Sequence, residues 1–383
     1  MKYITSQKNL LTDKRFLLLL LVWTIVQAVL LWQNGIVTGL EAEKYITQAL
    51  YFQEHGKLES SNYYLYFTQI FLIAAAYKFH LGYAVIIVIQ LLLNLLATAM
   101  FFQLANRFLK KSSIAFLATL FYIINIPYQV YNSFLFTESI FYSLVIIYSS
   151  YLLCLDRLTF KSFLIIIFLL ILLSITRPTG ILFFGATAVY LFARFLNRVH
   201  TIYKTLVIVI SVIFFLLVVD RMLDAGGSLD FMLPFKKENI ICGVNTIENA
   251  EIKTLEKGNS LEGLIYYISN NRQQFFRLTR LKTFAFFGML RSYYSFMHNT
   301  FLVFFFYPFY LLSLVGLWNK IRERDKRILY MVSIILLYWV TTLLTCDDWH
   351  NRFMLTISPF LFLLGFSTFS NFSLRTRTRV RRI

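Results

Sequence analysis

The sequence predicts an all-α polytopic membrane protein with about ten transmembrane helices, interfacial helices in the first outer loop and a small extracytoplasmic subdomain. Of its 383 residues, 58% are hydrophobic and only 15% are charged. Apolar runs of roughly 15 to 22 residues recur along the chain, and about 20 apolar residues in a helix cross a bilayer. This repetition excludes the two or three soluble domains that the length alone would indicate.

Ten apolar runs are predicted to span the membrane. They are Phe16–Gln33, Tyr83–Ala105, Ile114–Ile126, Leu135–Leu155, Phe163–Ile175, Ile181–Phe195, Leu206–Val219, Thr300–Trp318, Ile328–Thr345 and Phe353–Phe369. An eleventh run, Tyr64–Phe79, is apolar enough to cross, but its crossing would place Arg107, Lys110 and Lys111 outside. We therefore predict an interfacial or re-entrant segment there, within a first outer loop of residues 34–82. A true span with inverted topology is the alternative.

The charge distribution orients this bundle. With ten spans, the cytoplasmic segments hold 22 Lys and Arg but only 4 Asp and Glu, and the other 15 acids lie outside. Positive-inside orientation explains the net charge of +18 better than nucleic-acid binding, because the basic residues are spread over short loops. Both termini are then cytoplasmic, the basic N-terminal segment is a signal anchor, and the basic tail faces an anionic inner leaflet.

We expect three parts: a membrane module (1–219), an extracytoplasmic subdomain (220–299), and C-terminal helices with a basic cytoplasmic tail (300–383). Within the second part, Asn270–His298 is basic and aromatic, which is typical of a helix on a bilayer surface. The three cysteines have no metal-binding spacing and give no disulfide framework. Cys242 and Cys346 lie on the same predicted side and could pair.

Five separate stretches place ionisable side chains on the outer side in this topology. Glu41 and Glu43 follow the first span, Glu138 begins the fourth, and Arg177 ends the fifth. The last outer turn adds Asp347, Asp348, His350 and Arg352. Acids at the mouth of a membrane bundle more often carry chemistry than structure, so we predict an active site at this end.

Several motifs in this order resemble a known family. Glu41 lies four positions before Tyr45, and an aromatic run at 63–67 includes Tyr64. Residues 137–139 read TES, 177–180 read RPTG, and the last loop reads HNRFMLTISPFLFLL. Together they resemble the GT-C superfamily of integral-membrane glycosyltransferases, near the protein O-mannosyltransferase and aminoarabinose-transferase branch. The resemblance covers roughly Thr12–Leu196 and, more loosely, Thr300–Phe369.

The resemblance implies transfer of a sugar, with inversion, from a polyprenyl phosphate to an extracytoplasmic glycan, lipid or protein. The expected setting is a bacterial cytoplasmic membrane, with undecaprenyl phosphate as the carrier. A carboxylate must take the acceptor's hydroxyl proton, as in inverting glycoside hydrolysis. The phosphate leaves without an acid, and a guanidinium meets its growing charge. No cofactor or metal is required by this chemistry.

Glu41 is the expected base, where the family usually has Asp, and Glu43 is the alternative; both could instead complement a helix dipole. Arg352 is the first choice for the donor phosphate and Arg177 the second. Arg352 could equally pair with Asp347 or Asp348, and Arg177 could snorkel beside a proline. Supporting or substrate contacts are assigned to Glu138, Tyr45, His350, Asp347, Asp348 and Tyr64, with aromatic residues of 63–79 lining a polyprenyl groove. Glu138 could also simply begin its helix.

Two other functions remain open. A transporter or flippase of lipid-linked glycans predicts inverted repeats and charges buried in mid-span, whereas these spans are almost without ionisable residues. A catalytically inactive membrane scaffold is the other alternative, because Glu41 stands where the family usually has Asp.

Overall fold

The structure, a computed structural model, describes residues 10–195, 220, 230, 232–255 and 258–370. In this part of the chain the elements are helices, with two isolated β-bridges and no strand. The chain divides into two compact units. Unit 1 comprises residues 1–184, 308–328 and 358–383, and unit 2 comprises residues 185–307 and 329–357. The predicted span 206–219 and the basic tail from 371 lie outside the described residues.

Six helical segments among the described residues are long and apolar enough to cross a membrane. They are α1 (Lys14–Asn34), α4 (Gly82–Leu109), η4 with α9 (Pro178–Phe195), α14 (Phe296–Arg322), α15 (Arg327–Leu344) and α16 with η7 (Arg352–Ser370). A bent pair, Ser112–Ile123 with Ile126–Ser133, would make a seventh. The prediction of an all-helical, multi-pass membrane protein is therefore confirmed. Ten spans remain a prediction, because α7 (Thr137–Leu153) and α8 (Phe160–Thr176) have only 17 residues each.

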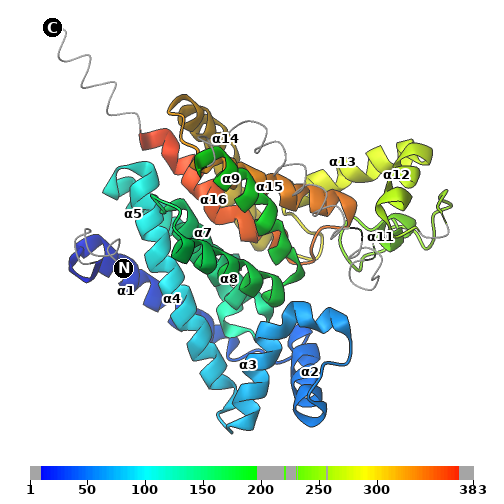
Figure 1. The fold of residues 1–383 in the computed structure, drawn as a ribbon, viewed down its shortest axis with the longest axis horizontal. Helices are drawn as coiled ribbons and strands as arrows, with labels where there is room; N and C mark the ends of the chain where they lie inside the picture. The colour runs from blue at the N-terminus through cyan, green and yellow to red at the C-terminus, as the bar shows by residue number, and fades with distance from the viewer. Residues whose placement is uncertain (1–9, 196–219, 221–229, 231, 256–257, 371–383) are drawn as a thin grey trace. The chain divides into compact units, whose positions relative to one another are not determined.

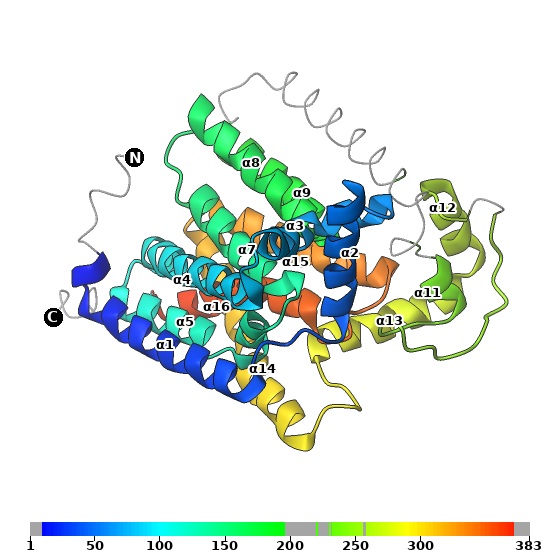
Figure 2. The ribbon, with the colours of Figure 1, turned by 90° about the horizontal axis from the view of Figure 1, so that it is seen from below.

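The run at 64–79 forms the second helix of a short helical hairpin with α2 (Glu41–His55). It folds as η2 (Ser61–Tyr66) followed by α3 (Phe67–Lys78), and α3 packs on α2, as Figures 1 and 2 both show. Twelve helical residues extend about 18 Å, which is less than the hydrocarbon thickness of about 30 Å. By its length α3 alone is too short to cross a bilayer, and an interfacial or re-entrant segment stays a prediction.

Helix α7 is the centre of unit 1. Of its 17 residues 15 are buried, and it packs against α4 and α8, while α4 also packs against α5 (Ser112–Ile123) (Figure 1). In the same unit α14 approaches α16 closely at Gly316, where a Cβ would lie 1.8 Å from the Leu364 carbonyl oxygen. Glycine is required at that crossing because any side chain would push the two helices apart.

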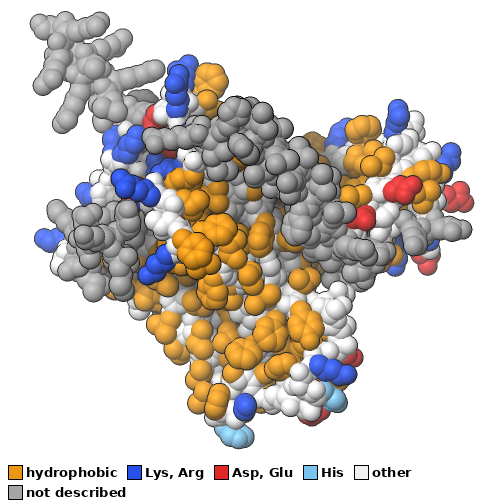
Figure 3. All heavy atoms as spheres, in the orientation of Figure 1, with side chains coloured by type: hydrophobic (Ala, Val, Ile, Leu, Met, Phe, Trp, Pro, Cys, Tyr) orange, Lys and Arg blue, Asp and Glu red, His pale blue; other side chains and the backbone are white. Residues whose placement is uncertain are grey.

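The outer surface of unit 1 is apolar where a bilayer would contact it. Figure 3 shows hydrophobic side chains over α4 and α8, with Lys and Arg gathered toward the junction of α4 and α5. Val88, Leu92 and Leu96 on α4 and Phe168 on α8 are each about half exposed or more. An exposed apolar face of this extent indicates contact with a membrane.

A polar network supports a break in the helices of unit 1. After α5, the chain bends by 59° into α6 (Ile126–Gln129) and η3 (Val130–Ser133). The Gln27 side chain donates to Gln129 Oε1 at 3.0 Å, and Asn132 Nδ2 donates to both glutamine oxygens at 3.1 Å. Ser139 Oγ donates to Asn132 Oδ1 at 2.6 Å. Such a network satisfies the buried side-chain amides and hydroxyl at the point where the helix is broken.

Replacing Asn132 by Leu is expected to lower the free energy of unfolding by about 1–3 kcal/mol. The change removes the donor to Gln27 and Gln129 and the acceptor for Ser139, all buried. Thermal unfolding followed by circular dichroism in detergent measures the loss. Gln33→Leu, at an exposed position of α1, is the control, and an unchanged midpoint for Asn132→Leu would contradict the role of the network.

The residues that follow this break also bind the segment that leads to α2 through backbone hydrogen bonds. Val37 N donates to the Ser133 carbonyl at 2.9 Å, and Leu135 N donates to the Val37 carbonyl at 3.1 Å. This parallel β-bridge between Val37 and Phe134 joins the chain entering α2 to the chain entering α7. The beginnings of these two helices, and the acids on them, are thereby brought together.

Unit 2 has a core of its own. Short helix α11 (Met232–Lys236), α12 (Leu261–Asn270) and α13 (Arg272–Gly288) bury Phe235, Tyr267 and Leu278 against one another. The polar insert predicted at 220–299 belongs to this unit, together with residues 185–219, 300–307 and 329–357. The pairing of Cys242 with Cys346, which the sequence left open, is present as a disulfide with a Cα–Cα distance of 5.1 Å.

Candidate functional site

Glu41 is the first residue of α2 and the centre of the site in unit 1. Its Oε1 accepts hydrogen bonds from the Tyr45 hydroxyl and from Lys44 Nζ, both at 2.8 Å. The spacing of four residues puts Glu41 and Tyr45 on one face of the helix. Tyr45 is fully buried, whereas the Glu41 side chain is 23% exposed, so the carboxylate lies at the boundary between core and solvent. Leu40 before it has a φ of 59°, a conformation that concentrates at functional sites.

A buried ion pair lies at the adjoining helix ends. Glu138, the second residue of α7, is fully buried, and Arg177 Nη1 donates to its Oε1. Arg177 follows α8 and is 8% exposed, so its interpretation as a snorkelling residue is wrong. Glu138 holds an arginine and does not merely begin a helix. The turn after Arg177 requires Gly180, where a Cβ would lie 2.2 Å from the Leu173 carbonyl oxygen.

Electrostatic interactions with Tyr45 show that Glu41 and the Glu138–Arg177 pair belong to one site. Burial raises the pKa of Tyr45 well above its usual value, and the negative charges of Glu41 and Glu138 raise it further. Arg177 partly opposes them. Charges act in this way only over short distances, so Glu41, Tyr45, Glu138 and Arg177 form one group. We refer to these four residues with Lys44 and Tyr66 as the Glu41 cluster.

Lys44 and Tyr66 are the members that the sequence analysis missed. Lys44 Nζ lies 4.8 Å from the ring centroid of Tyr45 and 4.7 Å from that of Tyr66, a cation–π geometry. The Lys44 side chain is 39% exposed. Its position three residues after Glu41 in a predicted helix was the signal that could have identified it.

Glu43 and Tyr64 lie apart from this cluster. Glu43 is exposed, and its Oε1 lies near Gly39, before the helix begins. It is placed to complement the dipole of α2. Tyr64 in η2 is about half exposed and stacks near Phe67 with ring centroids 6.3 Å apart. Phe71 continues this exposed aromatic stripe, which the predicted polyprenyl groove would use.

The remaining predicted residues form a second cluster, within unit 2. Arg352 Nε donates to Asp348 Oδ1 at 2.5 Å, so the loop pair that the sequence left open is present. The His350 ring is exposed, and its backbone N donates to Asp348 Oδ1 at 3.3 Å. Asp347 pairs with Arg291, and both side chains are fully buried. Nothing in the sequence singled out Arg291.

This second cluster is fixed by its backbone. Asp347 N donates to the Ile240 carbonyl at 2.8 Å, and Cys242 N donates to the Asp347 carbonyl at 2.9 Å, beside the disulfide. Burial raises the pKa of Asp347 to about 6, although Arg291 opposes the shift. Arg352 and Glu41 belong to different units, so their shared site stays a prediction.

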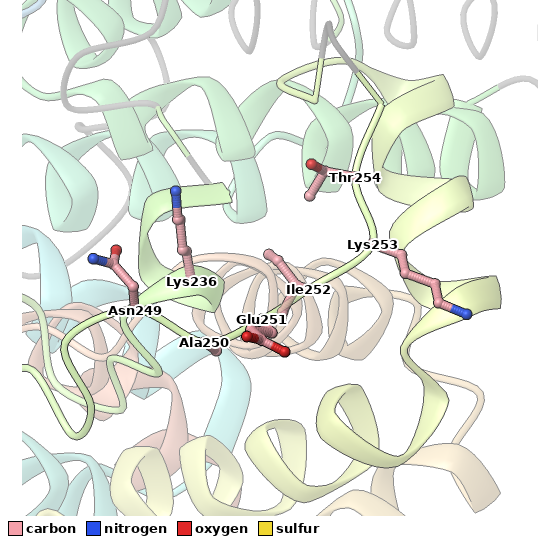
Figure 4. A pocket seen from close by; sticks show the side chains of 7 residues that line it. All are labelled: Lys236, Asn249, Ala250, Glu251, Ile252, Lys253 and Thr254. Carbon is pink, nitrogen blue, oxygen red and sulfur yellow. The ribbon is translucent and has the colours of Figure 1, made fainter.

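A hollow of about 570 Å³ lies elsewhere in unit 2. It is lined by Lys236 and by residues 249–254 (Figure 4). The side chains of Lys236 and Lys253 point in different directions there, so they do not converge on a ligand. None of the predicted site residues lines this hollow, and we assign it no chemistry.

Comparison with known proteins gives no match: no family model, no curated protein and no solved structure matches this chain. Of the two clusters, the Glu41 cluster combines a partly exposed carboxylate with a partly exposed cation. That combination is what a reaction needs to transfer a proton and neutralise a leaving anion.

Proposed function

We propose that the chain is an inverting, GT-C-type glycosyltransferase that moves a sugar from a polyprenyl phosphate to an extracytoplasmic acceptor. One observation supports this most: the partly exposed Glu41 carboxylate, held by Tyr45 and Lys44 beside a buried Glu138–Arg177 pair. In this proposal a lipid-linked donor reaches these residues along the apolar surface of the same unit.

Glu41 is the base in this proposal. It takes the proton of an acceptor hydroxyl while the hydroxyl oxygen bonds to the anomeric carbon. The bond from that carbon to the phosphate oxygen breaks, and the phosphate leaves with the electron pair. The Tyr45 hydroxyl donates to Glu41 and orients it, and the raised pKa of Tyr45 keeps that donor protonated at neutral pH.

Lys44 is the nearest cation for the leaving phosphate. Its Nζ lies 2.8 Å from Glu41 Oε1 and is partly exposed, whereas Arg177 is buried against Glu138. A phosphate that binds Lys44 would compete with Glu41 for the ammonium group. Donor binding would then leave the carboxylate available for the acceptor proton. Arg352 remains a second candidate for the phosphate.

The test is transfer from undecaprenyl-phosphate-linked radiolabelled hexoses in membranes that contain the protein and their own acceptors. Glu41→Gln is expected to lower the initial rate by about 10²–10⁴-fold, the typical contribution of a general base. Label leaving the lipid-phosphate fraction measures the rate. Because the amide keeps the size of the side chain, the loss reports chemistry more than packing.

Glu43→Gln is the matched control, two residues along the same helix on an exposed position. It is expected to keep the full rate. Full activity in Glu41→Gln, or loss only in Glu43→Gln, would reject Glu41 as the base. Membranes that release no label from any donor in the panel would reject the proposed function itself.

A further inference from the structure

Helix α13 has one face fixed to the body of unit 2. Leu278, Lys282 and Phe286 are buried on that face, and Leu278 belongs to the small core with Phe235. Lys282 Nζ donates to the Thr345 carbonyl at 2.5 Å and to the Leu343 carbonyl at 3.3 Å. The orientation of the helix about its axis is therefore set, and with it the face that points outward.

The outward face carries a regular stripe. Arg272, Phe276, Arg280 and Phe284 follow one another at intervals of four residues, which places them along one side of a helix. All four are exposed, and the two phenylalanines are exposed by 65% and 66%. The Arg280 guanidinium carbon lies 5.9 Å from the Phe284 ring centroid. We call these four residues the α13 stripe.

The charge of α13 has one sign. The helix holds four basic residues and no Asp or Glu. Lys282 is buried and Arg277 pairs with Glu238, so Arg272 and Arg280 are the cations on the outward stripe. Alternating arginine and phenylalanine suits the headgroup layer of a bilayer, where rings reach the acyl boundary and guanidinium groups meet phosphates.

The chain connection keeps this stripe near a membrane. Residues 289–295 join α13 to α14, a candidate membrane span, and seven residues extend no more than about 25 Å. The C-terminal end of α13 therefore lies within that distance of the start of a span. A bilayer surface is the apolar and anionic partner within reach.

We propose that the α13 stripe lies on the bilayer surface and binds anionic phospholipid headgroups through Arg272 and Arg280. Phe276 and Phe284 enter the acyl boundary. Because a guanidinium group is attracted to an anionic surface, the two arginines distinguish anionic from zwitterionic lipid. The inference is independent of the glycosyltransferase proposal.

Site-directed spin labelling tests the contact. Nitroxides at positions 276 and 284 are introduced in a Cys154→Ser background, since Cys242 and Cys346 are already bonded to each other. The protein is placed in phosphatidylcholine nanodiscs with or without phosphatidylglycerol. Power saturation then measures collision with oxygen, which enters the bilayer, and with a water-soluble nickel chelate, which does not. A label at Glu251, exposed in the loop at 249–254, is the aqueous control.

Labels at 276 and 284 are expected to be accessible to oxygen. Their accessibility to the nickel chelate should be several-fold lower than that of the label at 251. The contrast should be larger with phosphatidylglycerol and should shrink in Arg272→Gln/Arg280→Gln. Retention of the Cys242–Cys346 disulfide on a non-reducing gel shows that this variant has formed the native cysteine pair.

Three results would overturn the proposal. Nickel accessibility equal to that at 251 would place the stripe in water. Shielding from both oxygen and nickel would mean that protein covers it. Shielding that is the same with and without phosphatidylglycerol, and the same in the double arginine variant, would show that anionic headgroups do not take part in the contact.

Discussion

Replacing Arg177 by Met is expected to lower the free energy of unfolding of unit 1 by about 3–5 kcal/mol. The change removes the guanidinium that neutralises Glu138, a fully buried carboxylate. A buried charge whose partner is deleted costs more than the pair contributes, because the remaining ion is still out of water. Glu138→Gln is expected to have a similar cost, since it leaves the Arg177 charge buried.

The double variant Glu138→Gln/Arg177→Met separates this cost from simple loss of packing. It removes both charges, so its destabilisation should be smaller than the sum of the two single effects. Denaturant titration in detergent, followed by tryptophan fluorescence, to which the buried Trp23 of the same unit contributes, measures all three. Asp156→Asn is the control: its partner Arg107 is 3.8 Å away, the acid is exposed, and the expected effect is below about 1 kcal/mol. Strict additivity of the two single variants would contradict the pairing.

The transfer rate of the same double variant tests the Glu41 cluster. Glu138 and Arg177 both act on the environment of Tyr45, which holds Glu41. If the pair only stabilises the fold, the double variant should keep its transfer rate when it is assayed well below its unfolding midpoint. If the pair positions the base, the rate falls although the protein is folded.

The helical, multi-pass fold could be predicted because lipid imposes a strong constraint on sequence. Backbone groups in hydrocarbon must bond within a helix, so each span appears as an apolar run. The number of spans is harder to predict from the sequence, because α7 and α8 are short and α7 is almost wholly buried in protein. A buried apolar helix and a membrane span have the same composition.

The candidate site could be predicted only in part. Sidedness brought Glu41, Glu138 and Arg177 to one end of the bundle, and the structure joins them in the Glu41 cluster. The approach of Glu41 to Glu138 could not be predicted from the sequence, because it depends on the β-bridge between Val37 and Phe134, which joins the chain before α2 to the chain before α7. Arg291 could not be found, since an arginine in a basic segment gives no sign that it will be buried against Asp347. The disulfide is similar: the predicted sidedness allows it, but only the fold brings together two cysteines that are 104 positions apart in the sequence.

Lys282 should make the stability of unit 2 depend on pH. Its side chain is fully buried, and burial lowers its pKa to about 7 from an ordinary value of 10.5. Below pH 7 both the folded and the unfolded chain hold the proton, so the cost of burying the charge is fully present. Between about pH 7 and 10.5 the unfolded chain binds more protons, and the free energy of unfolding therefore rises with pH. A shift of this size corresponds to at most about 5 kcal/mol.

The difference between the wild type and Lys282→Met isolates this effect from every other titrating group. Methionine has no charge to bury, so its pH profile should lack the rise that the wild type shows above pH 7. Its loss of the hydrogen bonds to the Leu343 and Thr345 carbonyls adds a cost that is the same at every pH. Thermal unfolding followed by Trp fluorescence at several pH values between 6.5 and 9.5 measures the difference. Lys253→Met, at an exposed position, should follow the wild-type profile, and parallel curves for wild type and Lys282→Met would show that Lys282 keeps its proton in the folded protein throughout this range.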